Sequence, residues 1–168
     1  MKFFAYGMNM LGAKIMSLVT FPQYRGVARL QGYQMRFNKR GHKDNSGNTN
    51  LVKTGNPKDM VYGVVYEFGD SYKGDIERAE GLGFGYHSET LTVQLEDESI
   101  KVTAYLADEG DINDRLLPFE WYRDIVLLAA KQHGLPNEYI QYLESIQVAP
   151  DPDSARARIQ RMFLENAS

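Results

Sequence analysis

The stretch FAYGMN, residues 4–9, is the first place in the chain where the residue types suggest chemistry. Two aromatic residues and an alanine are typical of a β-strand, and Gly7 and Asn9 then favour a turn. A strand that ends in a turn with free backbone N–H groups can bind an anion, because those groups converge on one point. The pattern also fits a strand that simply ends, so both interpretations stay open on these residues alone.

Glu80 is a candidate acid–base group. It lies at the expected C-terminal end of a short helix over residues 75–80, directly before Gly81. The helix dipole disfavours a negative charge there by about 0.3–1 kcal/mol at exposed sites. Partial burial of the carboxylate would also raise its pKa and make it a better general base. An ordinary surface glutamate is the alternative that position alone leaves open.

Tyrosine is unusually frequent, with 11 tyrosines among 168 residues. Tyr86 begins an expected strand, Tyr105 ends another, and Tyr122 lies on an expected helix. A tyrosine hydroxyl can hydrogen-bond a ligand, but a tyrosine at any one of these positions is more often part of the core or the surface.

Several other kinds of chemistry are excluded by the residue types and their order. The chain has no cysteine, which excludes disulfides, thiolate nucleophiles and cysteine-bound metals. The histidines His42, His87 and His133 lack metal-ligand spacing, so we expect no metal site. The GLGFG run at residues 81–85 follows a helix and precedes a strand, which is the reverse of a dinucleotide-binding motif. We therefore expect no cofactor.

The charge balance also limits the partners that we expect. The formal net charge is −3 and the isoelectric point is about 5.6, which argues against binding to nucleic acid or an anionic membrane. The basic cluster Lys39, Arg40, His42 and Lys43 is expected to be a solvated loop. The sequence shows neither a signal peptide nor an apolar run of membrane-spanning length, so a cytoplasmic location is expected.

Strands are expected in the first two thirds of the chain and helices in the last third. This order predicts a single α+β domain over residues 1–168, with a mostly antiparallel or barrel-like sheet. Arg156, Arg158 and Arg161 are expected to form a solvated helix face, and Asn9 is expected to cap the first helix. The expected elements are strands over residues 2–6, 26–37 (interrupted at Gly32), 60–68, 86–95 and 100–106, a polar loop over 38–59, and helices over 10–19, 75–80, 119–133, 137–146 and 155–164.

Several motifs together resemble the γ-glutamylcyclotransferase family, which includes the AIG2-like proteins. The FAYGMN stretch is similar to the family's YGxN loop. The similarity continues in the same order and with the same spacing over nearly the whole chain, through VARLQGY (27–33), VYGVVYEF (61–68), AEGLGFGY (79–86), AYL (104–106) and KQHGLPNEYIQYL (131–143). The resemblance implies a small mixed β-barrel flanked by helices.

The resemblance also implies an activity and a set of site residues. Members of the family convert a γ-glutamyl compound to 5-oxoproline and a free amino acid or amine, without a cofactor. Glu80 corresponds to the general base, and the loop at residues 5–9 corresponds to the binding site for the glutamyl α-carboxylate. The implied substrate-binding residues are Ala5, Tyr6, Gly7, Met8, Asn9, Tyr86, Tyr105 and Tyr122. Met8 stands where the family usually has serine, which removes a hydroxyl but leaves the backbone N–H.

Three functions remain open at this point. The first is cyclisation of γ-glutamyl amino acids or peptides, and the second is cyclisation of another γ-glutamyl amide, such as a γ-glutamylamine or a protected intermediate. The third is a non-catalytic module that binds a small molecule. The expected partner is a small γ-glutamyl substrate rather than nucleic acid or membrane, and a homodimer remains open.

Overall fold

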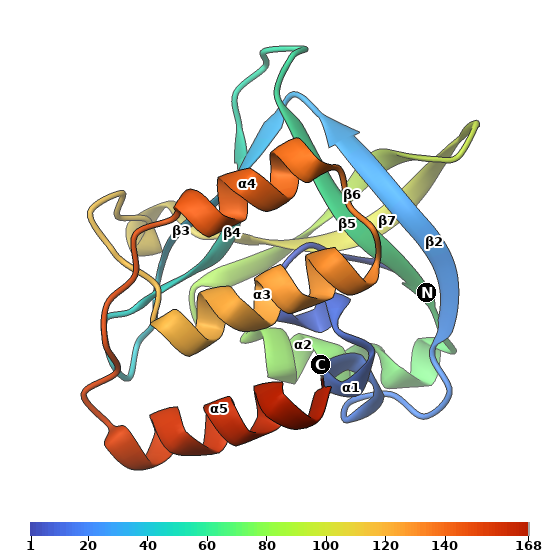
Figure 1. Cartoon of the computed structure of the whole chain (residues 1–168). Helices are drawn as coiled ribbons and strands as arrows, with labels where there is room; N and C mark the ends of the chain where they lie inside the picture. The colour runs from blue at the N-terminus through green and yellow to red at the C-terminus, as the bar shows by residue number, and fades with distance from the viewer. Residues whose placement is uncertain (168) are drawn as a thin grey trace.

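The chain is built around a closed β-barrel, which the computed structural model shows for residues 1–167 (Figure 1). Neighbouring strands follow the order β1-β5-β2-β6-β7, and β1 pairs with β7 to close the barrel. That pairing is parallel and the remaining ones are antiparallel, which confirms the predicted α+β fold with a mixed barrel. The barrel strands are β1 (Lys2–Ala5), β2 (Gln23–Gln31), β5 (Met60–Glu67), β6 (Tyr86–Leu95) and β7 (Glu98–Ala107).

Strand β5 lies between β1 and β2 and determines where β1 ends. Its nearly continuous apolar sequence is typical of a strand buried on both faces, and Val61, Val64 and Val65 are fully buried. A Cβ atom at Gly63 would lie 2.5 Å from the Ala5 carbonyl oxygen. Glycine at this position therefore allows the end of β1 to approach β5 closely, just before the chain turns at Gly7.

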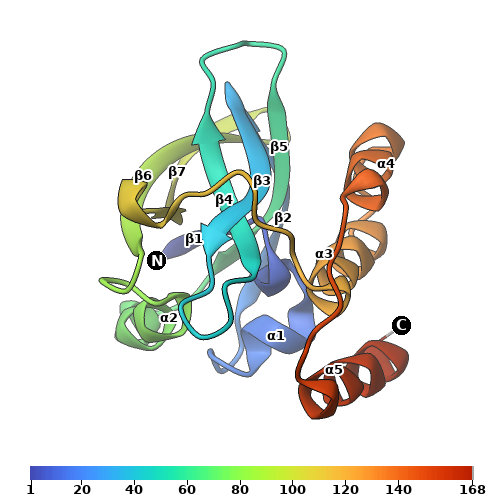
Figure 2. The ribbon, with the colours of Figure 1, turned by 90° about the vertical axis from the view of Figure 1, so that its left-hand side faces the viewer.

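The predicted polar loop over residues 38–59 is wrong, because much of it forms a second sheet beside the barrel (Figure 2). Strands β3 (Tyr33–Arg40) and β4 (Gly47–Lys53) pair antiparallel there, and the interruption expected at Gly32 is the turn between β2 and β3. Asparagine is uncommon in strands, and β4 contains Asn48 and Asn50, so the sequence did not predict a strand there. In the fold, the Asn50 side chain donates to the Asn38 side chain at 3.1 Å and accepts from the Ala107 N–H at 2.8 Å. The buried amide of Asn50 therefore has hydrogen-bond partners at both its nitrogen and its oxygen.

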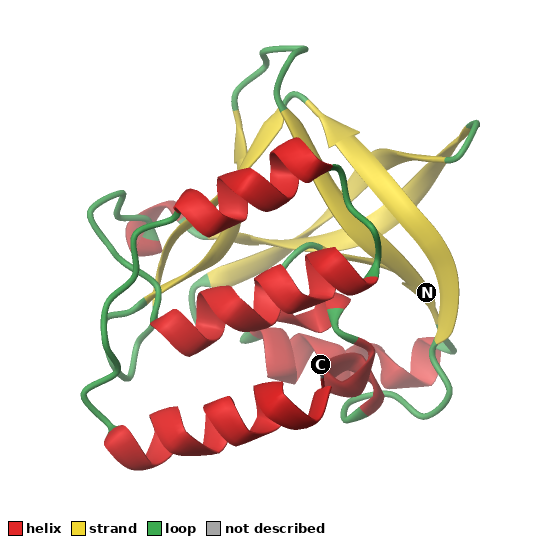
Figure 3. Cartoon of the chain, viewed as in Figure 1, coloured by secondary structure: helices red, strands yellow, loops and turns green. Residues whose placement is uncertain are grey.

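The helices occupy one side and one end of the barrel. Helices α3, α4 and α5 cover one side, and α1 and α2 lie at one end (Figures 2 and 3). None of the helices in residues 1–167 has the length and apolar character needed to cross a membrane. The helices are α1 (Gly12–Met16), α2 (Lys73–Glu80), α3 (Glu120–Gln132), α4 (Asn137–Ser145) and α5 (Ser154–Ala167), with 3₁₀ turns η1 (Met8–Met10), η2 (Asp70–Tyr72) and η3 (Glu109–Asp111).

The predicted capping role of Asn9 is wrong. Helix α1 begins at Gly12, and Leu11 occupies its N-cap position without a side-chain hydrogen bond. Asn9 lies in η1 instead, and its side-chain amide donates to Glu80 at the end of α2. The asparagine that looked like a local helix signal therefore makes a long-range contact.

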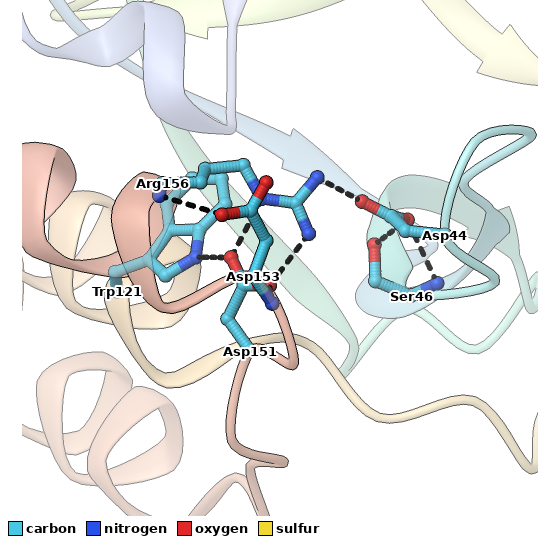
Figure 4. Close-up of polar contacts among 6 residues, drawn as sticks. All are labelled: Asp44, Ser46, Trp121, Asp151, Asp153 and Arg156. Carbon is cyan, nitrogen blue, oxygen red and sulfur yellow. Dashed lines mark hydrogen bonds and ion pairs between the residues drawn. The ribbon is translucent and has the colours of Figure 1, made fainter.

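Arg156 does not belong to a solvated face, contrary to the prediction (Figure 4). Its Nε and Nη2 each lie 2.6 Å from a carboxylate oxygen of Asp151, and its Nη1 lies 2.8 Å from Asp44. The Asp151 side chain is fully buried, and the bonds from Arg156 lower its pKa to about 2. These ion pairs join the start of α5 to the β3–β4 turn. The other two arginines of the predicted face are exposed, as expected.

Candidate active site

A pocket of about 370 Å³ lies where the end of β1, the C-terminal end of α2 and strand β4 meet. All the residues that the sequence indicated as site candidates line this pocket. They are Ala5, Tyr6, Gly7, Met8, Asn9, Glu80, Tyr86, Tyr105 and Tyr122. Residues separated by more than a hundred positions in the sequence thus line the same pocket. The chemistry of the pocket depends on the contacts that hold each side chain.

Glu80 is the last residue of α2 and lies in the pocket wall. The helix ends there because Gly81 adopts the left-handed conformation, with φ of 74°. The Asn9 Nδ2 atom donates a hydrogen bond to Glu80 Oε1 at 2.6 Å. Part of the Glu80 residue remains exposed, but protein atoms surround its carboxyl. This desolvation raises the pKa of Glu80 to about 7, although the hydrogen bond from Asn9 acts in the opposite direction. The carboxyl is therefore able to gain or lose a proton near neutral pH.

The loop after β1 lines the same pocket with Gly7, Met8 and Asn9. The η1 turn uses the N–H groups of Met10 and Leu11, which bond to the carbonyls of Gly7 and Met8 at 3.0 Å each. The first N–H groups of such a turn have no partner within the turn itself. Binding of an anion by this loop therefore stays a prediction, to which the η1 turn adds N–H groups that the turn itself does not use.

Gly7 is required for space rather than for backbone freedom. Its φ of −115° is accessible to any residue. A Cβ atom at Gly7, however, would lie 2.3 Å from Thr49 Oγ1. Thr49 cannot move away freely, because it is buried and β-branched and its hydroxyl lies 3.1 Å from the Tyr122 hydroxyl. The loop is thus packed directly on β4.

We expect Gly7→Ala to destabilise the protein by about 1–3 kcal/mol, because the added methyl group overpacks the contact with Thr49. Gly12→Ala is the matched control, since a Cβ atom there meets no atom within 4 Å. Urea denaturation of both variants measures the difference. Adding Thr49→Ala to Gly7→Ala should restore part of the loss, and a Gly7→Ala variant as stable as Gly12→Ala would contradict this account.

The pocket tyrosines are held mainly by backbone groups. Tyr6 donates to the Tyr105 carbonyl oxygen, Tyr86 donates to the Thr49 carbonyl oxygen at 2.7 Å, and Tyr122 is bonded to the Thr49 hydroxyl. Burial raises the pKa of Tyr6, Tyr86 and Tyr122, so these hydroxyls stay protonated. Tyr105 differs, because its buried hydroxyl has no hydrogen-bond partner within residues 1–167. Thr49, which no sequence pattern indicated, is hydrogen-bonded to both Tyr86 and Tyr122 and also packs against Gly7.

Tyr105→Phe and Tyr122→Phe should have opposite effects on stability. Removal of the unpartnered Tyr105 hydroxyl should leave the free energy of unfolding unchanged or raise it, by up to about 1–3 kcal/mol. Removal of the Tyr122 hydroxyl should lower it by about 1 kcal/mol, since the bond to Thr49 is lost. Chemical denaturation of the two variants side by side tests both expectations. A Tyr105→Phe variant that is the less stable of the two would show that the hydroxyl has a stabilising partner.

Lys39 is a pocket residue that the sequence interpretation missed. The basic cluster was expected to be a solvated loop, but Lys39 is only 4% exposed and lines the pocket. Its neighbours Arg40 and Lys43 are exposed, as expected. Lys39 is two and four residues after the buried Phe37 and Met35 on β3, and it lies beside a register shift in the β3–β4 pairing between Arg36 and Lys39.

The histidines lie outside the set of residues that line the pocket. His42 pairs with Asp111 at 3.3 Å and His87 with Asp108 at 2.8 Å, and His133 bonds to the Met10 carbonyl oxygen. Among the residues that the structure describes, 1–167, no group of three or more His, Cys, Asp or Glu side chains is placed to hold a metal ion. The acid–base candidate in the pocket is thus the Glu80 carboxyl.

Comparisons with known proteins agree with this fold. The AIG2-like family matches the chain at residues 60–143. Gamma-glutamylcyclotransferase of Homo sapiens is 28% identical over 149 residues, which cover 86% of this chain and 78% of the human protein. The Mus musculus protein of the same name is 27% identical over 151 residues, covering the same shares of the two chains.

Solved structures resemble the fold over nearly its whole length. A structure of a gamma-glutamyl cyclotransferase has a TM-score of 0.83 at 24% identity, covering 96% of this chain and 98% of that chain. The crystal structure of uncharacterized protein loc79017 from Homo sapiens has a TM-score of 0.81 at 25% identity, covering 95% and 97%. The barrel and the helices thus belong to a known architecture.

Proposed function

Because the chain belongs to the AIG2-like, γ-glutamylcyclotransferase family, we propose that it converts γ-glutamyl amino acids or peptides to 5-oxoproline and a free amino acid or peptide. The observation that carries the proposal is the Glu80 carboxyl, which lies in the pocket with a pKa of about 7 and is held by Asn9. A general base works best when its pKa is close to the operating pH.

The reaction is an intramolecular aminolysis. The ionised Glu80 carboxylate removes a proton from the substrate's α-ammonium group, and the freed amine attacks the γ-carbonyl carbon. A bond forms between the α-nitrogen and this carbon, and the bond between the carbon and the leaving nitrogen breaks. Glu80 returns its proton to the leaving nitrogen as that bond breaks. It then removes the second proton from the new ring nitrogen and passes it to the released amine, which leaves as an ammonium group, so that the carboxylate is regenerated and no cofactor takes part.

The loop at residues 5–9 holds the substrate in the folded shape that cyclisation needs. The backbone N–H groups at the start of η1 bind the α-carboxylate, and Asn9 keeps the Glu80 carboxylate beside the α-amine. Fixing the two reacting ends of a flexible chain near each other removes much of the entropic barrier. Because the binding groups belong to the backbone, Met8 serves in place of the family's serine.

The experiment that tests the function is an assay for 5-oxoproline with a panel of γ-glutamyl dipeptides, γ-glutamyl peptides and γ-glutamyl amines. The proposal expects 5-oxoproline from the dipeptides or peptides. Product from the amines alone would indicate a cyclotransferase for a different leaving group. Binding without any 5-oxoproline would indicate a non-catalytic module, and neither binding nor product would contradict all three functions.

A further inference from the structure

The Lys39 ammonium is a buried positive charge without an anionic partner of its own. Within residues 1–167, no carboxylate lies within the 4.0 Å of an ion pair, and its one hydrogen bond, to the Phe84 carbonyl oxygen, is 3.4 Å long. The nearest acidic side chains, Asp108 and Asp111, are paired with His87 and His42. An ammonium has three donors, so most of its hydrogen-bonding capacity is unused.

Burial of this charge costs free energy, and the nearby charges of Asp111 and Asp108 offset that cost only in part. Desolvation lowers the pKa of Lys39, as expected for an ammonium removed from water without a close counter-charge. The Tyr86 ring, 4.8 Å from Nζ, offers a cation–π contact as partial compensation. A group held in this way, in the wall of a pocket, is suited to an anion that arrives with a ligand.

The position of Lys39 indicates which part of the substrate it meets. The pocket floor is formed by the buried end of β1 and by Gly7, where the loop binds the glutamyl α-carboxylate in the proposed function. Lys39 donates instead to the backbone carbonyl of Phe84, a residue that is 77% exposed and marks the rim, while Lys39 itself is only 4% exposed and lies beneath it. The leaving group must extend from the γ-carbonyl toward solvent, and therefore toward this rim.

The second lysine of the pocket wall is already engaged elsewhere. Lys14 Nζ lies 4.1 Å from the centre of the Phe163 ring and 3.5 Å from the Gln160 side-chain oxygen, both on α5. Its ammonium is thus directed at a helix of the protein. The two contacts of the Lys39 ammonium, with the Phe84 carbonyl and the Tyr86 ring, are both to residues that line the pocket, so this ammonium stays in the pocket wall, where a ligand can reach it.

We propose that the Lys39 ammonium binds the carboxylate of the leaving group, so that the enzyme selects γ-glutamyl compounds whose leaving group is an amino acid or peptide. This inference rests on the proposed function and assigns a specificity-determining residue to the same site. Since the contact lies on the leaving group, it discriminates among substrates and leaves the cyclisation step to Glu80.

The test compares two substrates that differ in a single group, γ-glutamyl-L-alanine and γ-glutamyl-L-alaninamide. Lys39→Met removes the charge and keeps the length of the side chain, and Arg40→Met removes the adjacent, exposed charge as the matched control. The specificity constant kcat/KM is measured for each variant by 5-oxoproline release. Affinity is measured by calorimetry with the same substitutions added to Glu80→Gln, so that turnover is slow.

Lys39→Met should lower both kcat/KM and affinity for γ-glutamyl-L-alanine at least about tenfold, as expected for a lost hydrogen bond between charged groups. The values for the alaninamide should change by less than about fivefold, and Arg40→Met should leave both substrates within that range. Equal losses for the two substrates would overturn the inference, because Lys39 would then act on the glutamyl moiety or on the structure. Unchanged values for both would overturn it as well.

A stability measurement separates binding from a structural role. Replacing an unpaired buried ammonium by methionine should leave the melting temperature unchanged or raise it. A clear fall would indicate that the contact with Tyr86 is structural and would count against the proposal. If the wild-type protein releases no 5-oxoproline, the proposed function fails. The calorimetry still decides whether Lys39 binds the carboxylate of the alanine group. If neither compound binds, both proposals fail.

Discussion

Glu80→Gln should lower the rate of 5-oxoproline formation by at least about 10²–10⁴-fold, which is the usual contribution of a general base. The amide keeps the size of the side chain and can still accept the hydrogen bond from Asn9, so the fold should be retained. Glu77→Gln is the matched control, since Glu77 lies one turn earlier on α2 and pairs with Lys73 at the surface. Near-normal turnover by Glu80→Gln would show that another group is the base.

The pH dependence of activity follows from the raised pKa of Glu80. The carboxyl must be ionised to accept a proton, so kcat/KM should rise as the pH passes through about 7. This limb of the profile should be absent from the residual activity of Glu80→Gln and should persist in Glu77→Gln. A limb near 7 that survives in Glu80→Gln would belong to a different group.

The same pKa predicts how the substitution affects stability. The folded protein keeps the Glu80 proton up to about pH 7, whereas the unfolded chain releases it near the ordinary value of 4.5. Stability from this group is therefore fully present below pH 4.5 and is lost as the pH rises through about 7. At pH 8 the cost is about 3 kcal/mol, so Glu80→Gln should be more stable than the wild type at pH 8 by up to that amount, and not at pH 4.

A γ-glutamyl compound with an acetylated α-amine should release no 5-oxoproline at all. Its nitrogen lone pair is delocalised into the amide, so it cannot attack the γ-carbonyl, however well the compound binds. The unmodified compound assayed in parallel is the control, and the products are identified by mass spectrometry. Release of N-acetylglutamate would contradict the mechanism, because water would then be the nucleophile.

The α-carboxylate should matter for a different reason. A substrate that lacks it can still cyclise, but it loses its hydrogen bonds to the loop at residues 5–9, each worth about 1.5–3 kcal/mol for a charged group. Its kcat/KM should therefore fall steeply without reaching zero. Comparable turnover with and without this group would show that the loop does not bind it.

The hydrophobic patterning and the motifs were sufficient to predict most of the barrel and of the pocket. Strands β1, β5, β6 and β7 lie close to the ranges expected from the sequence, and α3, α4 and α5 lie close to the expected helices. These signals are local, because the burial of each residue depends on its own element. The YGMN loop and Glu80 stood out by residue type and position, but only the family resemblance singled them out as site residues.

The features that the sequence did not reveal depend on partners far along the chain. Asn9 was expected to cap a helix, but its amide reaches Glu80, 71 positions away. Strand β4 is polar, and the side-chain oxygen of its Asn50 accepts a hydrogen bond from the Ala107 N–H on barrel strand β7. Lys39 lies in the pocket wall, where its contacts are with Phe84 and Tyr86, more than forty positions along the chain. A polar side chain can be buried wherever a residue far along the chain provides its hydrogen-bond partner. Only the tertiary structure determines where those partners lie.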